Sequence, residues 1–305
     1  MDFTNFTELV RLEVSKKLDN SYTVRLDDIR KNNGIILKGL TITQGNCNIS
    51  PTIYLNNQFT DYINGKSTLS DTVSYVLDTY NKNKIGQSVD MRYFLNYEEI
   101  KERVIYKLIN TERNKELLKD IPHIEFLDLS IVFQCLISQE EFGFSSILIH
   151  NVHLKLWDIS VEKLYEAAKE NTPRLLPYQI KSMQQVLFEI MKEQNPKEYS
   201  SEDCIKHSTN NIPMFVFSNQ YKVEGASCIL YPNVLHDFAD TINSSFYIIP
   251  SSIHEVLLLP TKTTKESASI LSMIQEINDT QVSVEEILSY SLYFYDKRTD
   301  KVVKV

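Results

Sequence analysis

The sequence predicts an α+β protein with a mainly antiparallel sheet, helices packed on one side of it, and a smaller N-terminal αβββα lobe. Three observations predict this class. The strand-like segments are short, tight turns join most of them, and single helices interrupt them instead of alternating strictly with them. With 42% hydrophobic and 10% aromatic residues, the 305-residue chain can also form a sizeable apolar core.

Residues 1–85 form the predicted N-terminal lobe. It starts with an amphipathic helix whose apolar residues recur every three or four positions: Phe3, Phe6, Val10, Val14 and Leu18. Three strands and a second helix follow, at Tyr22–Ile29, Ile35–Thr43, Ile49–Leu55 and about Thr68–Tyr80. Asn33 and Gly34 are expected to join the first two strands, because both residues tolerate the positive φ of a tight hairpin.

Residues 86–305 form a larger α+β domain, or continue the first lobe as one domain. Its first helix follows Asn96 and carries Ile100, Val104 and Leu108 on one face. Further helices are predicted at Ser160–Lys169, closed by Asn171 and Pro173, and at Ile180–Gln194, Asn233–Ile242, Lys265–Ile277 and Val284–Leu288. Strands are predicted within Ile124–Ser138 and at Phe144–Ile149, Met214–Ser218, Ala226–Tyr231, Phe246–Ile249, Val256–Leu259 and Ser291–Asp296.

The formal net charge is −8, and it is unevenly distributed. Residues 1–90 carry ten basic and ten acidic side chains, whereas residues 91–305 carry 22 basic and 30 acidic ones. Nucleic-acid binding depends on a basic surface that displaces counterions from phosphates. The charge balance therefore disfavours a nucleic-acid partner.

The compartment signals favour the cytoplasm. The N-terminus lacks the charged and apolar regions of a secretory signal, and no apolar run reaches the roughly 18 residues of a spanning helix. Cys47, Cys135, Cys204 and Cys228 are few and scattered, as expected of thiols that stay reduced. We therefore expect no membrane partner.

The sequence predicts no cofactor. It has seven glycines, and none is arranged as a phosphate-binding loop, for which close backbone approach is essential. The nearest approach to a Walker A loop runs from Gly34 to Thr41, but Leu40 stands where the phosphate-binding lysine is required. The alternation of this segment predicts a strand of a hairpin instead.

His150 and His153 are candidate metal ligands, because their spacing places two imidazoles on one face of a helix. No carboxylate or cysteine stands at a supporting spacing, so a structural role is favoured. Cys204 and His207 lie in a polar segment that predicts a loop and have no second ligand pair in range. No metal site is therefore predicted.

One turn between two apolar strands carries the most suggestive group of side chains. It contains Ser251, Ser252, His254 and Glu255, and the preceding helix can add Asp237 or Asp240. Together they are candidates for a hydrolase-like centre. Against this interpretation, Pro-Ser-Ser is ordinary turn chemistry, and the adjacent His254 and Glu255 point to opposite faces of a strand.

Four blocks of residues together carry a family resemblance. They are Asn33–Gly34 with Gly39–Ile42 and Asn48–Leu55; Asn114–Leu118 with Pro122–His123 and Asp128–Leu129; His153–Trp157 with Asn171–Pro173; and Leu230–Pro232 with Ile249–Ser252 and His254–Val256. The chain thereby resembles an uncharacterised bacterial family, domain-of-unknown-function family 5688, common in anaerobic gut bacteria. The resemblance spans nearly the whole chain and implies a single architecture, but it implies no activity and no catalytic residue.

The leading functional hypothesis is a cytosolic, non-enzymatic binding or accessory protein. It would engage a protein partner through its acidic C-terminal part or an exposed strand edge. Two alternatives stay open. One is a hydrolase-like enzyme centred on the turn from Ser251 to Glu255, and the other is a nucleic-acid-associated protein with a local basic face.

Overall fold

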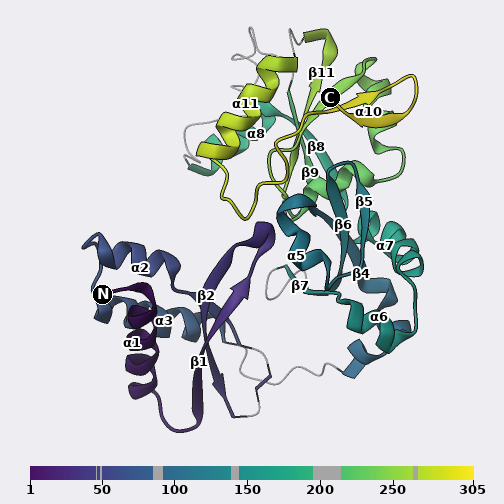
Figure 1. Ribbon diagram of the computed structural model, residues 1–305. Helices are drawn as coiled ribbons and strands as arrows, with labels where there is room; N and C mark the ends of the chain where they lie inside the picture. Colours follow the sequence, from purple (N-terminus) through teal and green to yellow (C-terminus); the bar gives the residue numbers. More distant parts are fainter. Residues whose placement is uncertain (46, 49, 85–91, 139–143, 195–213, 264–266) are drawn as a thin grey trace. The chain divides into compact units, whose positions relative to one another are not determined.

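The computed structural model describes residues 1–45, 47–48, 50–84, 92–138, 144–194, 214–263 and 267–305 (Figure 1). The chain divides into two compact units, Met1–Tyr93 and Phe94–Val305. Each unit has its own sheets and its own apolar core. The domain boundary that the sequence suggests, at residue 85, falls at the start of residues 85–91, which lie outside the described ranges.

The N-terminal unit combines helices with a three-stranded antiparallel sheet of order β1-β2-β3. Its elements are α1 (Phe3–Lys16), β1 (Tyr22–Arg30), β2 (Ile36–Gln44), β3 (Thr52–Tyr54), α2 (Asn56–Ile63) and α3 (Leu69–Asn83). Asn33 and Gly34 adopt φ values of 59° and 71° between β1 and β2, which confirms the predicted hairpin. Helix α2 was not predicted, because most of its residues are polar and its contact with the ring of Phe6 depends on tertiary packing.

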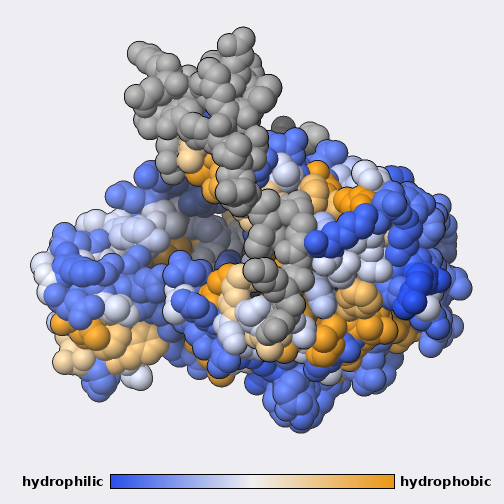
Figure 2. All heavy atoms as spheres, turned by 90° about the horizontal axis from the view of Figure 1, so that it is seen from above, coloured by the Kyte–Doolittle hydropathy of each residue, from blue (hydrophilic) through white to orange (hydrophobic). Residues whose placement is uncertain are grey.

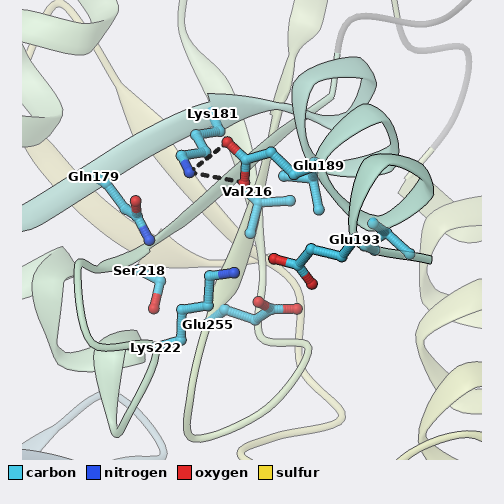
Figure 3. Close-up of a pocket in the computed structure, with 10 residues that line it drawn as sticks. Gln179, Lys181, Glu189, Glu193, Val216, Ser218, Lys222 and Glu255 are labelled. Atoms are coloured by element: carbon cyan, nitrogen blue, oxygen red, sulfur yellow. Dashed lines mark hydrogen bonds and ion pairs between the residues drawn. The ribbon is translucent and has the colours of Figure 1, made fainter. Parts of the chain in front are cut away.

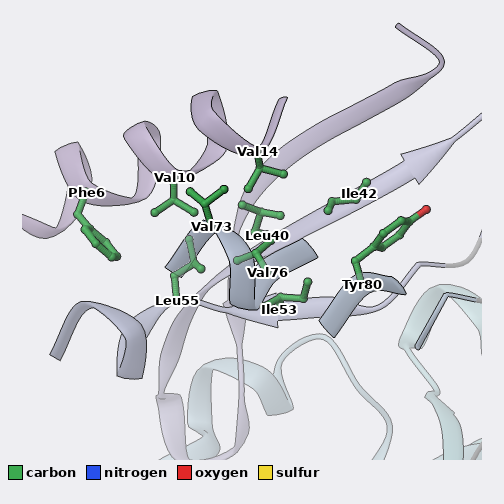
Figure 4. Close-up of a cluster of buried hydrophobic side chains, with 10 residues drawn as sticks. All are labelled: Phe6, Val10, Val14, Leu40, Ile42, Ile53, Leu55, Val73, Val76 and Tyr80. Carbon is green, nitrogen blue, oxygen red and sulfur yellow. The ribbon is translucent and has the colours of Figure 1, made fainter. Parts of the chain in front are cut away.

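The core of this unit lies where α1, the sheet and α3 meet (Figure 4). Its members are Phe6, Val10, Val14, Leu40, Ile42, Ile53, Leu55, Val73, Val76 and Tyr80, none more than 5% exposed. Phe6, Val10 and Val14 recur every four residues along α1, so one face of this helix supplies all three. The periodicity of the sequence therefore located this core correctly.

The C-terminal unit begins with a four-stranded antiparallel sheet. Its strands are β4 (Val104–Asn110), β5 (His123–Phe126), β6 (Leu129–Ser138) and β7 (Ser145–Leu148), and β6 pairs with each of the other three. The helices of this part are α4 (Tyr97–Ile100), α5 (Lys115–Leu118), α6 (Asn151–Trp157) and α7 (Val161–Leu175).

The second sheet of this unit has six strands in the order β13-β12-β10-β11-β9-β8, and every neighbouring pair is antiparallel. The strands are β8 (Tyr178–Ser182), β9 (Phe215–Asn219), β10 (Phe246–Ile249), β11 (Val256–Pro260), β12 (Tyr293–Asp296) and β13 (Lys301–Lys304). They are accompanied by α8 (Met183–Gln194), α10 (Val234–Ile242), α11 (Ser267–Thr280) and the 3-10 helix η5 (Gly225–Leu230). Helix α11 packs Ile270 and Ile274 into a core with Leu257 and Leu259 of β11. Short strands in antiparallel sheets with interspersed helices confirm the predicted α+β class.

One predicted helix is a strand. Residues 104–108 belong to β4, and the helix before them ends at Ile100. Val104, Ile105 and Ile109 are β-branched, which favours an extended backbone. Both faces of β4 are buried, so the alternation that identifies a half-exposed strand is absent.

Other element boundaries also differ from the prediction. Ile180 lies in β8, so α8 begins later, at Met183. Residues 226–230, predicted as a strand, lie in η5, and the helix predicted at 284–288 is a turn over 284–286 followed by irregular backbone. Both segments take part in long-range backbone hydrogen bonds, such as that from the N–H of Ile253 to the carbonyl of Glu286, which local patterns do not encode. Within the described ranges, every helix is too short or too polar to cross a bilayer.

Helix α7 continues past its predicted end to Leu175 and uses its last turns to cover the free edge of β4. The Oγ1 of Thr172 accepts a hydrogen bond from the N–H of Tyr106 at 3.0 Å. The Nδ2 of Asn171 donates to the carbonyl of Val104 at 3.1 Å. These side chains satisfy backbone groups that a neighbouring strand would otherwise pair.

A partly buried carboxylate joins the two sheets of the C-terminal unit. Asp128, between β5 and β6, accepts hydrogen bonds from the hydroxyls of Ser289, Ser291 and Tyr293 at 2.7, 2.8 and 2.8 Å. Burial raises the pKa of Asp128, but the three hydroxyl groups and the positive charge of Lys304 together outweigh burial and hold its pKa below the ordinary value. The segment that enters β12 is thereby anchored to the first sheet.

Thr172→Val tests the edge contact, because it removes the acceptor of the Tyr106 N–H and keeps the shape of the side chain. We expect the free energy of unfolding to fall by about 1–3 kcal/mol, the usual effect of an unpaired buried donor. Urea unfolding followed by the fluorescence of Trp157, the single tryptophan, reports on this unit. The Thr172 hydroxyl also donates to the carbonyl of Ala168, four residues earlier. The exposed Thr280 on α11 makes the same kind of bond to Glu276, so Thr280→Val is the matched control and should change stability by less than about 0.5 kcal/mol. Equal losses in the two variants would contradict the assignment.

Candidate functional site

The turn singled out in the sequence connects β10 to β11, and Ser252 holds it closed. The N–H of Ser252 donates to the carbonyl of Glu255 at 3.1 Å. Its Oγ accepts from the backbone N–H of His254 at 3.0 Å. The N–H of Ser251 donates to the carbonyl of Ile249 at 2.9 Å. Ser252 thus makes the hydrogen bonds of an ordinary tight turn.

The imidazole of His254 contacts two other segments of the chain. Its Nδ1 accepts a hydrogen bond from the backbone N–H of Glu224 at 3.1 Å, and its Nε2 lies 3.5 Å from Oε1 of Glu286. Because Nδ1 acts as an acceptor, we assign the proton of the neutral ring to Nε2. The carbonyl of His254 also accepts from the hydroxyl of Ser218 at 2.7 Å. His254 therefore ties the turn to its surroundings.

A hydrolase-like centre would need a serine hydroxyl within reach of this imidazole. The hydroxyl of Ser252 instead bonds to the backbone of His254, and both ring nitrogens face other groups. Asp237 lies on α10 with its side chain 71% exposed, and its Oδ1 is 3.6 Å from Nδ1 of His236. The structure thus gives the Ser252 hydroxyl and the Asp237 carboxylate contacts with groups other than the imidazole of His254.

A loop between β9 and η5 holds the turn from the other side. Asn219, which is fully buried, organises this loop: its Oδ1 accepts from the N–H groups of Tyr221 and Val223 at 3.0 and 3.4 Å, and its Nδ2 donates to the carbonyl of Val223 at 2.7 Å. Lys222 and Glu224 adopt φ values of 55° and 54°. This left-handed conformation costs a residue with a side chain about 1 kcal/mol or more, so the surrounding contacts must impose it.

Gly225 allows this loop to pack directly against the turn. A Cβ atom at this position would lie 2.2 Å from the Oγ of Ser218, and 2.6 Å from both the backbone N of Asn219 and the carbonyl oxygen of His254. Backbone atoms cannot move aside as the end of a flexible side chain can. Glycine is therefore the residue that fits this close approach.

Glu224 links the loop to the first sheet of the unit. Its Oε1 lies 2.6 Å from Nζ of Lys107 on β4 and accepts a hydrogen bond from Nε2 of Gln134 on β6 at 3.2 Å. The Lys107 and Glu224 side chains are only 18% and 12% exposed. A charge buried this deeply needs its partner, so the pair fixes where the loop lies.

A cavity of about 250 Å³ lies between α8 and the strands β8 and β9, beside the same loop and turn (Figure 3). Three elements of secondary structure supply most of its walls, the loop adds Lys222, and the turn adds Glu255. Its charged groups are Lys181, Glu189, Glu193, Lys222 and Glu255. Val186, Ile190 and Val216 provide an apolar wall, so the pocket combines an apolar surface with a few converging charges, as binding sites commonly do.

The charges of this pocket are only partly paired. Nζ of Lys181 lies 2.7 and 2.8 Å from the two carboxylate oxygens of Glu189. The charged ends of Glu193, Lys222 and Glu255 converge in Figure 3, yet none of the three forms an ion pair within the described part of the chain. With three carboxylates and two ammonium groups, the pocket carries an excess of negative charge.

His150 and His153 lie at the start of α6, where they pack on aromatic rings. The N–H of His150 donates to Nδ1 of His153 at 3.0 Å, and the ring of His153 stacks on that of Trp157 with centroids 5.5 Å apart. Burial lowers the pKa of His153, and the neighbouring His150 lowers it further. Among the described residues, no group of three or more His, Cys, Asp or Glu side chains could hold a metal ion.

The described cysteines are free thiols. Burial raises the pKa of Cys135 to about 11 and that of Cys228 to about 12, so both stay protonated at neutral pH. Cys47 is partly buried. The candidate pair Cys204 and His207 lies outside the described residues.

Comparison with known proteins places the chain in a family. A family of unknown function, DUF5688, matches residues 3–297, and the chain belongs to it. Comparisons with curated proteins and with solved structures returned no match. The match confirms the resemblance found in the sequence and assigns no activity, so a function has to be argued from the site itself.

Most groups of this site were not identified from the sequence. The missed residues are Lys107, Lys181, Glu189, Glu193, Lys222 and Glu224. Lys107 and Glu224 are 117 positions apart and carry no local signature of their pairing. Only Glu189 and Glu193 offered a signal, since residues four apart share one face of a helix.

Glu224→Gln tests whether the buried pair fixes the loop. We expect a loss of about 3 kcal/mol in the free energy of unfolding, because the ammonium of Lys107 stays buried without a counter-charge. Adding Lys107→Met should recover part of that loss. The control is Glu189→Gln, since its pair with Lys181 is 40% and 30% exposed and should contribute at most about 1 kcal/mol. Similar effects of both substitutions on urea unfolding, followed by Trp157 fluorescence, would refute the special role of Glu224.

Proposed function

We propose that this protein is a cytoplasmic, non-enzymatic binding protein that engages a protein partner through the outer face of α8 and the adjoining pocket. The observation that carries the proposal is an exposed apolar stripe that runs directly into a pocket whose Glu193, Lys222 and Glu255 form no ion pair with other described residues. Free thiols at Cys47, Cys135 and Cys228 agree with a reducing compartment.

The stripe consists of Leu187, Ile190 and Met191, which are 47%, 45% and 46% exposed. Their spacing of three and four residues places them side by side on α8. Ile190 also lines the pocket, so the stripe and the pocket form one continuous surface. Most of the face in Figure 2 is hydrophilic, with hydrophobic residues gathered in separate patches. A contiguous group of exposed apolar side chains is typical of an interaction surface.

The charges beside the stripe favour a partner segment that is both apolar and basic. Glu193 and Glu255 offer carboxylates at the edge of the apolar surface. Residues 91–305 carry 30 acidic and 22 basic side chains, so their net field attracts cations. Complementary charge would guide the partner to this surface and fix its orientation, while the apolar stripe supplies most of the affinity.

A photo-crosslinking experiment tests the proposal. In the full-length protein, p-benzoyl-phenylalanine replaces Leu187, and the protein is irradiated in cells of its source organism. We expect a discrete crosslinked species that mass spectrometry identifies as one partner. Because Coulomb attraction contributes to docking, Glu193→Gln together with Glu255→Gln should reduce its yield severalfold.

The matched control carries the same probe at Val152, which is 64% exposed on α6 of the same unit. This position should yield no such species. The proposal fails if the two positions capture the same proteins, or if the probe at position 187 captures none.

A further inference from the structure

We infer that the pocket beside α8 binds the ammonium group of a lysine side chain, held between Glu193 and Glu255 and provided by the partner. This inference rests on the proposed function and names the chemical group of the partner that enters the pocket. It follows from three properties of the pocket: its residual charge, its size and its apolar wall.

The residual charge calls for a single positive group. Glu193 projects from α8 and Glu255 from the turn before β11, and in Figure 3 their carboxylates converge on the same space as the ammonium group of Lys222. Lys181 already neutralises Glu189. Lys222 offsets one of the two remaining carboxylates, which leaves one negative charge. An ammonium group between the two carboxylates would balance it and donate a hydrogen bond to each.

The size and the wall suit a single side chain. A cavity of about 250 Å³ is smaller than the roughly 300–1,000 Å³ of pockets for drug-sized ligands. Val186, Ile190 and Val216 line one side of it. A lysine buries its methylene stem along such a surface while its charged end stays among polar groups. The same wall is continuous with the stripe on α8, so flanking apolar residues of the partner would contact Leu187 and Met191.

Other charged ligands fit less well. An anion would meet two carboxylates and the single ammonium group of Lys222 in this space, so the net charge there opposes it. A divalent cation such as calcium takes six or more oxygen ligands, and the described residues contain no group of three potential ligands suited to a metal. A guanidinium group prefers one carboxylate in its own plane, whereas an ammonium is a compact charge that can donate in three directions. Carboxylates that arrive from two different elements therefore favour lysine.

A titration with capped lysine tests the inference on the isolated full-length protein. Nα-acetyl-lysine methylamide is added at low salt, and binding is followed by chemical-shift changes in NMR spectra of the ¹⁵N-labelled protein. We expect saturable shifts, and none with the Nε-acetylated compound, which has the same stem without the charge. Glu193→Gln and Glu255→Gln should each weaken binding about tenfold, the effect of losing one charge-assisted hydrogen bond. Glu276→Gln, an equal change of charge on the exposed face of α11, should leave the affinity unchanged.

Three results would overturn the lysine site: no saturable shift with the capped lysine, equal binding of the acetylated compound, or equal weakening by Glu276→Gln. The outcome is separable from that of the proposed function. A crosslink at position 187 without binding of capped lysine would support the protein-binding surface on α8 and reject the lysine site. Binding of capped lysine without a crosslink would keep the amine site and reject the protein partner.

Discussion

The arrangement of the site depends on one buried ion pair between the first sheet of the C-terminal unit and the loop before η5. Lys107 of β4 and Glu224 of the loop before η5 are joined at 2.6 Å, with both side chains largely withdrawn from solvent. Desolvation makes such a pair a poor source of net stability, but it makes a separated pair very costly. The pair therefore acts as a positional constraint. The backbone N–H of Glu224 donates to Nδ1 of His254, so the residue that forms the ion pair also ties the loop to the turn between β10 and β11.

The loop before η5 and the turn between β10 and β11 contribute both to the buried contacts and to the open pocket. In the loop, Glu224 faces the ion pair and Lys222 lines the pocket. In the turn, His254 faces the loop and Glu255 lines the pocket. Lys222 and Glu224 keep left-handed backbone conformations that an isolated loop would avoid, and the buried contacts offset this strain. Substitutions in the Lys107–Glu224 pair are therefore expected to shift Lys222 and Glu255 in the pocket through the backbone of the loop and the turn.

The sequence predicted elements that carry a local signal, and its errors fall where only long-range contacts decide the structure. The first hairpin follows from Asn33 and Gly34, whose own conformations produce the turn. Because His254 and Glu255 are adjacent, we expected their side chains to point in opposite directions. The ring of His254 contacts the loop before η5, and Glu255 lines the pocket. Strand β4 was misread as helix because burial on both faces removes its alternation. The partnership of Lys107 with Glu224 spans 117 positions and leaves no local pattern.

Rigid support for its charged groups is what makes the pocket suited to binding. Glu193 projects from a helix, Glu255 stands where β11 begins, and Lys222 is held in a loop organised by Asn219. Association costs free energy for every side chain and loop that must become ordered. Backbone supports that are already fixed reduce this cost, so even a small ligand can be held by few contacts. The buried pair that constrains the loop therefore contributes to binding without touching the ligand.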